Sequence, residues 1–391
     1  MNRRQVTPVV MLAVTLVAGA CGKSSTSGPK VPTSVGKGEG QLNLIAWLGY
    51  TEDGSTDPKS DWVHPFEKQT GCQVHVKYGN TSDEMVTLMR QGGGSVYDGV
   101  SASGDATNRL IAHGDVAAVN VNLVPGYKQF VPTLQSPPHN TVNGVHYGVS
   151  YMYGANELMY NTNSVTPAPT SWSTVFDPSS PYAGKLTAYD SPIYIADAAL
   201  YLKTHQPSLG IKDPYELTSA QLDAATALLK AQKPNVKKYW SAAADEIDLF
   251  TSGDLVAGTA WPYQVSILQA DHQPVAAGIP SEGATGWADT WMISSHAKHP
   301  NCMYKWMQWA STPQVQVQVA EFYGATPSNT ASCSILTAGI GAAAAAPYHC
   351  GDEAFVHQLY LWKTPLAQCG NGQSNCMDYS VWEQKWTEVK G

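Results

Sequence analysis

Charged side chains are scarce in this sequence. Asp, Glu, Lys and Arg together make up 14% of the 391 residues, and the excess of acidic over basic residues gives a net charge of −8. No long run of lysine or arginine occurs. Because binding to nucleic acid depends on basic side chains that neutralise phosphates, we expect no nucleic-acid partner.

Familiar catalytic and metal-binding motifs are also missing. The chain contains no GxSxG, HExxH or CxxC motif, and QGGGS at 91–95 lacks the lysine and hydroxyl of a phosphate loop. His349 beside Cys350, and His296 with His299, lack the further ligands that zinc requires. We therefore expect no metal, no cofactor and no catalysis. A secreted enzyme stays open as an alternative, because catalytic groups can converge from distant positions.

The first twenty residues have the pattern of a secretory signal. Arg3 and Arg4 precede an uncharged run over residues 5–20, which is too short for a membrane-spanning helix. The run ends in LVAGAC at 16–21, which resembles a bacterial lipobox. We therefore predict a signal peptide over residues 1–20 and a lipid on Cys21, which would anchor the protein outside the cytoplasm at the bacterial cell membrane. An ordinary cleaved signal is the alternative.

Residues 21–40 are rich in Gly, Ser, Thr, Pro and Lys and contain no aromatic residue, so we expect a flexible tether. The remaining chain, residues 41–391, is longer than a single core usually spans. This length predicts two lobes.

Six cysteines follow Cys21, and an even number in an exported chain indicates disulfides. Spacing suggests that two pairs close short loops, and the third pair follows by elimination, although fifteen pairings are open in principle. The expected pairs are Cys369 with Cys376, Cys333 with Cys350, and Cys72 with Cys302.

Strands and helices alternate along the first part of the folded chain. Residues 42–47, 72–79 and 97–103 have the pattern of strands, and helical patterns separate them at 62–71 and 81–94. Such β-α-β-α-β alternation predicts a largely parallel sheet with ligand sites at the carboxyl ends of its strands.

A second α/β region is predicted further along. Residues 219–232 and 244–253 have helical patterns, residues 255–261 form a strand pattern, and residues 301–322 read as helix interrupted near Pro313. Several polar and aromatic residues fall at or just after predicted strand ends, where this fold class places ligands. They are Trp47, Ser101, Ser103, Asp105 and Trp261.

Many segments, in order, resemble the spermidine/putrescine-binding branch of the solute-binding proteins of ABC importers. The segments are LNLIAWLGY, FEKQTGCQVHV, YDGVSASGDATNRLIAHG, GVHYGVSYMYGANELMYNTNSV, SGDLVAGTAWPYQ, IPSEGATGWADTWMIS and AEFYGATPSN. The resemblance implies an α/β fold of the type II periplasmic-binding-protein kind, with two hinged lobes that each hold a largely parallel sheet flanked by helices. It implies an N-lobe from residues 41–147 and 286–331, and a C-lobe from residues 148–285 and 332–391.

The resemblance also implies a ligand site for a small cationic amine such as putrescine or spermidine. Aromatic rings and one carboxylate would surround the ammonium, with hydroxyl and amide groups beside them. The expected ligand-binding residues are Trp47, Tyr50, Ser103, Asp105, Trp261, Gln264, Trp287, Asp289 and Tyr323.

Departures from the family pattern leave the ligand open. Leu48-Gly49 and Gln264 stand where relatives carry polar or acidic residues, and Ile193 and Tyr194 stand where acids are usual, although Asp190 is near. Asp105 could serve as a second anchor. An amino acid, GABA, a quaternary amine or an altered polyamine pose are therefore alternatives.

The resemblance further implies that the protein acts as a monomer, without catalysis, and hands its ligand to ABC permease subunits. Five other tryptophans are predicted to be packing residues, because four of them recur at helical spacing. They are Trp291, Trp306, Trp309, Trp382 and Trp386.

Overall fold

The computed structural model describes residues 31–391. The predicted signal peptide and the predicted lipid site at Cys21 lie outside these residues. Within residues 31–391, no helix combines the length and the apolar character that a membrane crossing requires.

Seven strands form the first sheet, in the order β13-β6-β12-β3-β1-β2, with β14 also paired to β12. Pairing is parallel for β1 with β2 and β3 and for β14 with β12, whereas β12 runs antiparallel to β3 and β6. The strands are Gln41–Ala46 (β1), Gln73–Tyr78 (β2), Gly99–Ala102 (β3), Val149–Ala155 (β6), Ala284–Ile293 (β12), Thr326–Pro327 (β13) and Leu359–Leu361 (β14).

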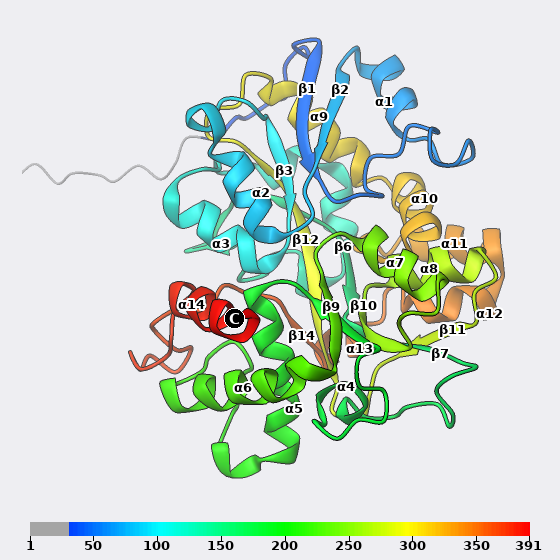
Figure 1. Cartoon of the computed structure of the whole chain (residues 1–391). Coiled ribbons are helices and arrows are strands. Elements are labelled where there is room, and N and C mark those ends of the chain that lie inside the picture. The colour runs from blue at the N-terminus through cyan, green and yellow to red at the C-terminus, as the bar shows by residue number, and fades with distance from the viewer. Residues whose placement is uncertain (1–30) are drawn as a thin grey trace, which may run out of the picture. The chain divides into compact units, whose positions relative to one another are not determined.

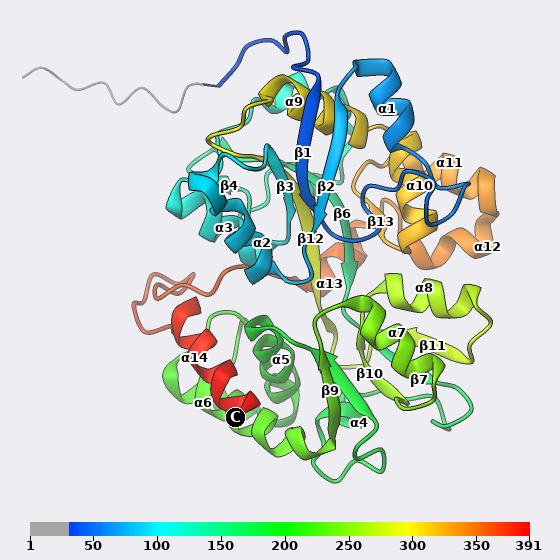
Figure 2. The ribbon, with the colours of Figure 1, turned by 45° about the horizontal axis from the view of Figure 1, so that its top comes forward.

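Five strands form the second sheet, in the order β11-β7-β10-β8-β9. Figure 2 shows this sheet below the first, with β12 running from one towards the other. The strands are Glu157–Asn161 (β7), Leu186–Tyr189 (β8), Val236–Trp240 (β9), Ala257–Ala260 (β10) and Val275–Gly278 (β11). A hairpin of Thr141–Val142 (β4) and Val145–His146 (β5) stands apart from both sheets.

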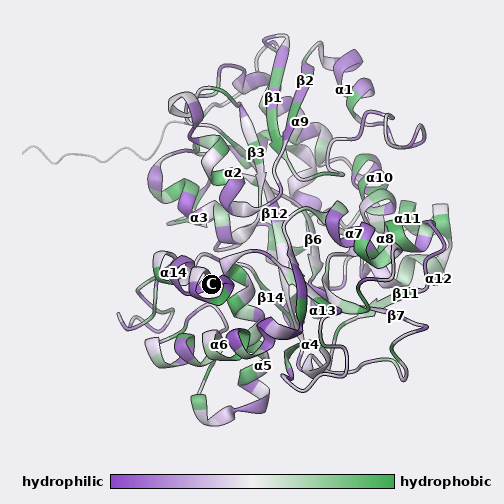
Figure 3. Cartoon of the chain, in the orientation of Figure 1, coloured by the Kyte–Doolittle hydropathy of each residue, from purple (hydrophilic) through white to green (hydrophobic). Residues whose placement is uncertain are grey.

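Helices pack on both sheets (Figure 1). On the first sheet α1 contacts α9 and α2 contacts α3, while around the second sheet α6 contacts α5 and α14, and α7 contacts α8. Figure 3 shows that the same helices alternate between hydrophobic and hydrophilic residues, as expected for helices with one buried face. The helices are Val63–Thr70 (α1), Ser82–Met89 (α2), Gly104–His113 (α3), Ser173–Phe176 (α4), Ile195–His205 (α5), Ser219–Gln232 (α6), Ala243–Thr251 (α7), Pro262–Ala270 (α8), Pro300–Ala310 (α9), Pro313–Tyr323 (α10), Ser332–Ile340 (α11), Ala342–Ala345 (α12), Glu353–Gln358 (α13) and Tyr379–Lys390 (α14).

Local sequence explains where several helices begin and end. The Thr81 hydroxyl accepts the Glu84 N–H and caps α2. Gly71 ends α1 in the left-handed conformation, with φ of 72°, which glycine adopts without a steric penalty. Pro313 begins α10 directly after α9, so the predicted interruption near this proline is confirmed.

The two-lobe α/β fold is confirmed, but both sheets are mixed, not largely parallel. The reason is that strands pass between the lobes: β6 leads through Asn156 into β7 of the second sheet, and β12 returns from β11 to the first. Each crossing strand enters its sheet antiparallel to a neighbour.

The predicted lobe boundaries stay a proposal, and strand pairing differs from them at three places. β6, the start of β12 and β14 pair in the first sheet, although residues 148–285 and 332–391 were assigned to the second lobe. Helix α11 likewise packs on α10. Only the C-terminal part of residues 332–391 lies with the second lobe, where α14 packs on α6.

The end of the predicted tether is held against the first lobe. The Gly36 N–H donates to the Asn301 side chain at 2.7 Å, and the Glu39 carboxylate accepts the N–H groups of Asn301 and Cys302 at 3.0 and 2.9 Å. These N–H groups lie in the first turn of α9, where they have no partner within the helix. The predicted tether, residues 21–40, is therefore wrong at its end: residues 36–39 belong to the folded part.

Three disulfides close the folded part, and all three expected pairs are confirmed. Cys72–Cys302 joins the chain across 230 residues, whereas Cys333–Cys350 and Cys369–Cys376 close loops of 17 and 7 residues. The first bridge ties the segment before β2 to α9, so it links the two chain portions that build the first lobe.

The glycine at position 104 allows the segment after β14 to lie close against α3. A Cβ on Gly104, the first residue of α3, would lie 1.9 Å from the carbonyl oxygen of Trp362. The Thr364 hydroxyl then donates to the Asp105 carbonyl at 2.7 Å, which fixes the segment after β14 against the start of α3.

Candidate functional site

Four of the predicted site residues meet because of how β1, β3 and β12 pair. Trp47 and Tyr50 follow the carboxyl end of β1, and Ser103 follows that of β3. Since these strands are parallel neighbours, both ends lie at the same edge of the sheet. β12 runs antiparallel to β3 in a register that places Asp289 beside Ser103.

Asp289 is a buried carboxylate held by two hydroxyl groups. The Tyr50 hydroxyl donates to Oδ2 at 2.6 Å, and the Ser103 hydroxyl donates to Oδ1. Only 2% of the Asp289 surface is exposed, and no ion pair formed within residues 31–391 includes it. Burial raises the pKa of Asp289 to about 7, although the hydrogen bonds from Ser103 and Tyr50 oppose this shift.

Aromatic rings from both sheets enclose this carboxylate. Trp47, from the first sheet, packs edge to face on Trp261 with ring centroids 5.5 Å apart. Trp261 follows β10 of the second sheet. Tyr323 lies 4.9 Å from the Tyr50 ring and 5.8 Å from Trp287. The site is therefore walled by both lobes.

Several buried polar atoms around these rings have no hydrogen-bond partner within residues 31–391. A buried donor or acceptor without a partner is costly, so such a group of atoms indicates that a polar molecule can bind there. The atoms are Trp47 Nε1, Trp287 Nε1, Trp362 Nε1, Tyr151 OH and Tyr189 OH.

Three of these residues were missed by the sequence analysis. Tyr151 packs 5.2 Å from Tyr50, and Tyr189 stacks on Trp362 at 5.7 Å and contacts Trp261 at 5.1 Å. Tyr189 ends β8, so the rule that ligands lie at strand ends could have found it. No comparable signal marks Tyr151 or Trp362.

The Asp105 carboxylate, which could have been a second ligand anchor, binds other residues of the protein. Its carboxylate accepts the Ser82 hydroxyl at 2.8 Å and lies 3.9 Å from Arg109, one turn along the same helix. Burial raises the pKa of Asp105 to about 6, and Arg109 opposes the shift. The second ammonium site that this residue was expected to offer is therefore already occupied by Arg109.

Gln264 and Asp190 also bond within the protein. The Gln264 amide donates to the buried Glu246 carboxylate at 3.0 Å, and burial raises the Glu246 pKa. Asp190 accepts the Trp386 indole N–H and the Lys390 ammonium, both at 2.9 Å. The structure thus brings seven of the nine predicted residues together around Asp289 and leaves Asp105 and Gln264 with other partners.

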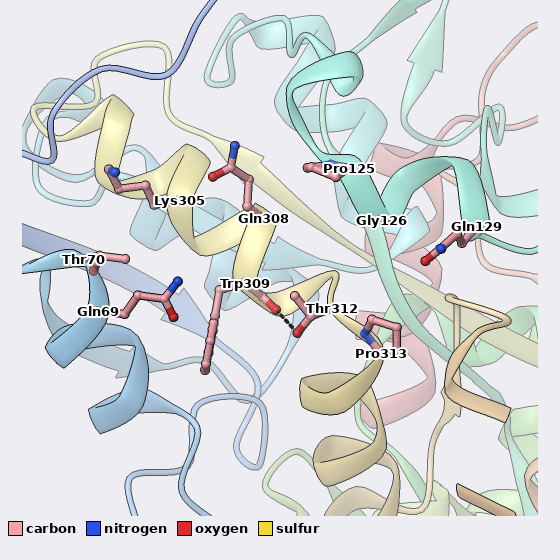
Figure 4. A pocket seen from close by; sticks show the side chains of 10 residues that line it. All are labelled: Gln69, Thr70, Pro125, Gly126, Gln129, Lys305, Gln308, Trp309, Thr312 and Pro313. Carbon is pink, nitrogen blue, oxygen red and sulfur yellow. Dashed lines mark hydrogen bonds between the residues drawn. The ribbon is translucent and has the colours of Figure 1, made fainter. Parts of the chain in front are cut away.

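A cavity of about 110 Å³ opens where the lobes meet at these rings, lined among others by Trp47, Trp261 and Tyr323. A larger cavity lies elsewhere, with about 510 Å³ between α1, α9, α10 and residues 125–129 (Figure 4). Its one charged lining residue is Lys305, and it contains none of the predicted residues. A lysine in its wall does not suit a cationic ligand, so the smaller cavity is the candidate site. Asp289 does not line the smaller cavity, but Tyr323, which does, packs on the Tyr50 ring whose hydroxyl donates to Asp289.

Four of the five tryptophans predicted to be packing residues are buried. Trp291 lies against Tyr151 and Trp306 in the core, and Trp382 and Trp386 are buried on α14. Within residues 31–391 no three His, Cys, Asp or Glu side chains gather as a metal site.

The chain matches a family model described as bacterial extracellular solute-binding protein over residues 61–345. The spermidine/putrescine-binding periplasmic protein of Escherichia coli K12 is 24% identical over 76% of this chain and 80% of its own length. The putrescine/cadaverine-binding protein of Pseudomonas aeruginosa is 24% identical over 97% of this chain and 98% of its own length. A solved structure described as a putative spermidine/putrescine ABC transporter from Listeria monocytogenes superposes with a TM-score of 0.71 at 19% identity, covering 90% of this chain and 99% of that one.

Proposed function

The chain belongs to the bacterial extracellular solute-binding proteins, and we propose that it captures a small organic amine at Asp289 and delivers it to an ABC permease. One observation carries this proposal: Asp289 is a buried carboxylate with hydroxyl partners and no cationic partner within residues 31–391. A desolvated negative charge is costly unless a cation compensates it. A bound ammonium ion would supply that charge.

The aromatic rings suit the same ligand. A cation over an aromatic face gains about 0.5–2 kcal/mol, and a charge-assisted hydrogen bond adds about 1.5–3 kcal/mol. Micromolar affinity corresponds to about −8 kcal/mol. Contacts with Asp289 and with the Trp47, Trp261 and Trp287 rings are therefore sufficient in order of magnitude.

The polyamines named for the two relatives, putrescine above all, are the ligands we favour. Asp289 would bind one ammonium. Because Ser82 and Arg109 already engage Asp105, the second ammonium would depend on Asp197, a buried carboxylate that accepts the Thr285 hydroxyl and lines a small recess with Trp261 and Trp362. An amino acid, GABA or a quaternary amine, which carry one cationic group, are the alternatives.

Capture would also change the balance between open and closed forms. Trp47 belongs to the first lobe and Trp261 to the second, so a ligand between them gains both contacts only when the lobes are closed. Differential affinity of this kind shifts the population towards the closed form. We propose that the closed form of a monomer, anchored by a lipid on Cys21, is what the permease recognises.

Titration calorimetry with putrescine tests the site. Asp289→Ala and Trp261→Ala should each weaken binding at least about tenfold, which corresponds to 1.4 kcal/mol. Trp309→Phe is the matched control, because Trp309 lines the distant cavity of Figure 4, and it should bind as the wild type does. Wild-type affinity in both cleft variants would overturn the site.

A thermal-shift panel then identifies the ligand class, since a ligand that binds only the folded state raises the melting temperature. The panel contains putrescine, spermidine, choline, GABA, arginine and neutral sugars. A shift with an amine that disappears in Asp289→Ala supports the proposal. A shift with a sugar alone would retain the solute-binding family and refute the amine, and turnover of any compound would support the enzyme alternative.

A further inference from the structure

A second recess, with a carboxylate in its wall, adjoins the cleft. Its volume is about 380 Å³, and its walls come from β7 and α8 of the second lobe and from the segment after α12. The polar and aromatic lining residues are Glu157, Ser266, Gln269 and Tyr348.

Glu157 carries the only charge among the lining side chains of this recess. Its carboxylate accepts no hydrogen bond and forms no ion pair with any residue of the described range 31–391. Burial raises the pKa of Glu157 to about 7, and no neighbouring group opposes this shift. Glu157, the first residue of β7, is half-buried, so its carboxylate stands on the wall of the recess without a protein partner among residues 31–391.

The other walls supply groups that suit an organic cation. The Gln269 amide N–H₂ donates to the Val275 carbonyl at 3.3 Å, which leaves its amide oxygen as an acceptor. The Ser266 hydroxyl is a second acceptor, and Tyr348 adds an aromatic ring. No lysine, arginine or histidine lines the recess to compete for Glu157.

We propose that this recess binds a small organic ammonium ion, with Glu157 as its counter-charge. A metal ion is a poorer fit, because calcium and magnesium need several oxygen ligands and Glu157 is the single carboxylate here. Two other cavities of this size each have a lysine in their walls, which disfavours a cation: Lys305 lines the one in Figure 4, and Lys59 lines the third.

The recess is separate from the cleft but adjoins it. None of the nine predicted cleft residues lines it, yet Pro262 and Gly324 in its wall directly follow Trp261 and Tyr323. The proposal is therefore independent of what the cleft binds, and a test must remove binding at Asp289 first.

The probe is n-propylammonium chloride, added to the full folded chain carrying Asp289→Asn. Calorimetry should show saturable binding, and adding Glu157→Gln should weaken it at least about tenfold, because the charge-assisted hydrogen bond is lost. The neutral analogue n-propanol should not bind. A crystal of Asp289→Asn grown with the probe should show the ammonium within hydrogen-bond distance of Glu157.

Glu321→Gln is the matched control. Glu321 is an exposed carboxylate near Tyr348 that does not line this recess, so its replacement should change the affinity by less than about twofold. Absence of saturable binding to Asp289→Asn, equal affinity with and without Glu157, or a probe that occupies another position in the crystal would each overturn the proposal. Loss of putrescine binding in Asp289→Asn is measured separately, so a wrong assignment of the cleft can be told apart from a wrong assignment of the recess.

Discussion

Amine binding should weaken steeply in acid, because Asp289 must be ionised to hold an ammonium. Burial raises the pKa of this carboxyl to about 7 in the ligand-free protein. Below that pH the group is protonated, and a proton must leave before the cation binds. Aliphatic ammonium groups, with a pKa near about 10, stay charged throughout this range.

The size of the effect follows from the pKa. Each pH unit below about 7 should lower the apparent affinity about tenfold, or 1.36 kcal/mol, so putrescine should bind about a hundredfold more weakly at pH 5 than at pH 8. Above about pH 8 the affinity should be constant. Ser103→Ala removes a hydrogen bond that lowers this pKa, so its profile should shift to higher pH.

Calorimetry at pH 5, 6, 7 and 8, in two buffers of different ionisation enthalpy, measures both the affinity and the protons released. Release should approach one proton per ligand in acid and vanish above about pH 8. In Asp289→Asn the slope should disappear together with most of the affinity. A wild-type profile that stays flat between pH 5 and 8, or a slope that persists in Asp289→Asn, would refute the reasoning.

The other predictions concern stability. Burial raises the pKa of Asp197 to about 7, so the contribution of this carboxyl to the free energy of unfolding is favourable in acid and is lost as pH rises from about 4 to 7. Asp197→Asn should therefore raise the melting temperature at pH 8 by at least about 5 °C and change it little at pH 4. Gly104→Ala forces a Cβ onto a backbone carbonyl and should lower the free energy of unfolding by about 1–3 kcal/mol in urea titrations, whereas Gly278→Ala, with open space around it, should have little effect. Replacing Cys72 and Cys302 by serine should cost about 3–5 kcal/mol by the same assay, because this bridge closes a loop of 230 residues; an unchanged urea midpoint would contradict the role given to it.

The order of helices and strands could be predicted from the sequence, because the residues that begin and end each element act locally. The Thr81 cap, the glycine after α1 and the proline at the start of α10 act through neighbouring backbone atoms, so their effects need no knowledge of the fold. The closely spaced pairs Cys333–Cys350 and Cys369–Cys376 are local in the same sense.

Strand direction was not readable in this way. Alternating strands and helices predict parallel neighbours, but β6 and β12 cross between the lobes and pair antiparallel with strands far away in sequence. The neighbours of β6 and β12 depend on which sheet each strand joins. This depends on the fold of the complete chain, not on the local sequence.

The sequence by itself determined which residue types gather at the candidate site: strand ends supplied Trp47, Ser103 and Trp261, and the resemblance supplied Asp289. Only the tertiary structure decided which of the acids is free. The sequence predicted ligand binding for both Asp105, in the first turn of α3, and Asp289. In the structure Ser82 and Arg109 bind the Asp105 carboxylate, whereas Asp289 has only hydroxyl partners. A carboxylate's availability depends on the charges and donors within a few ångströms, and those come from segments that only folding brings together.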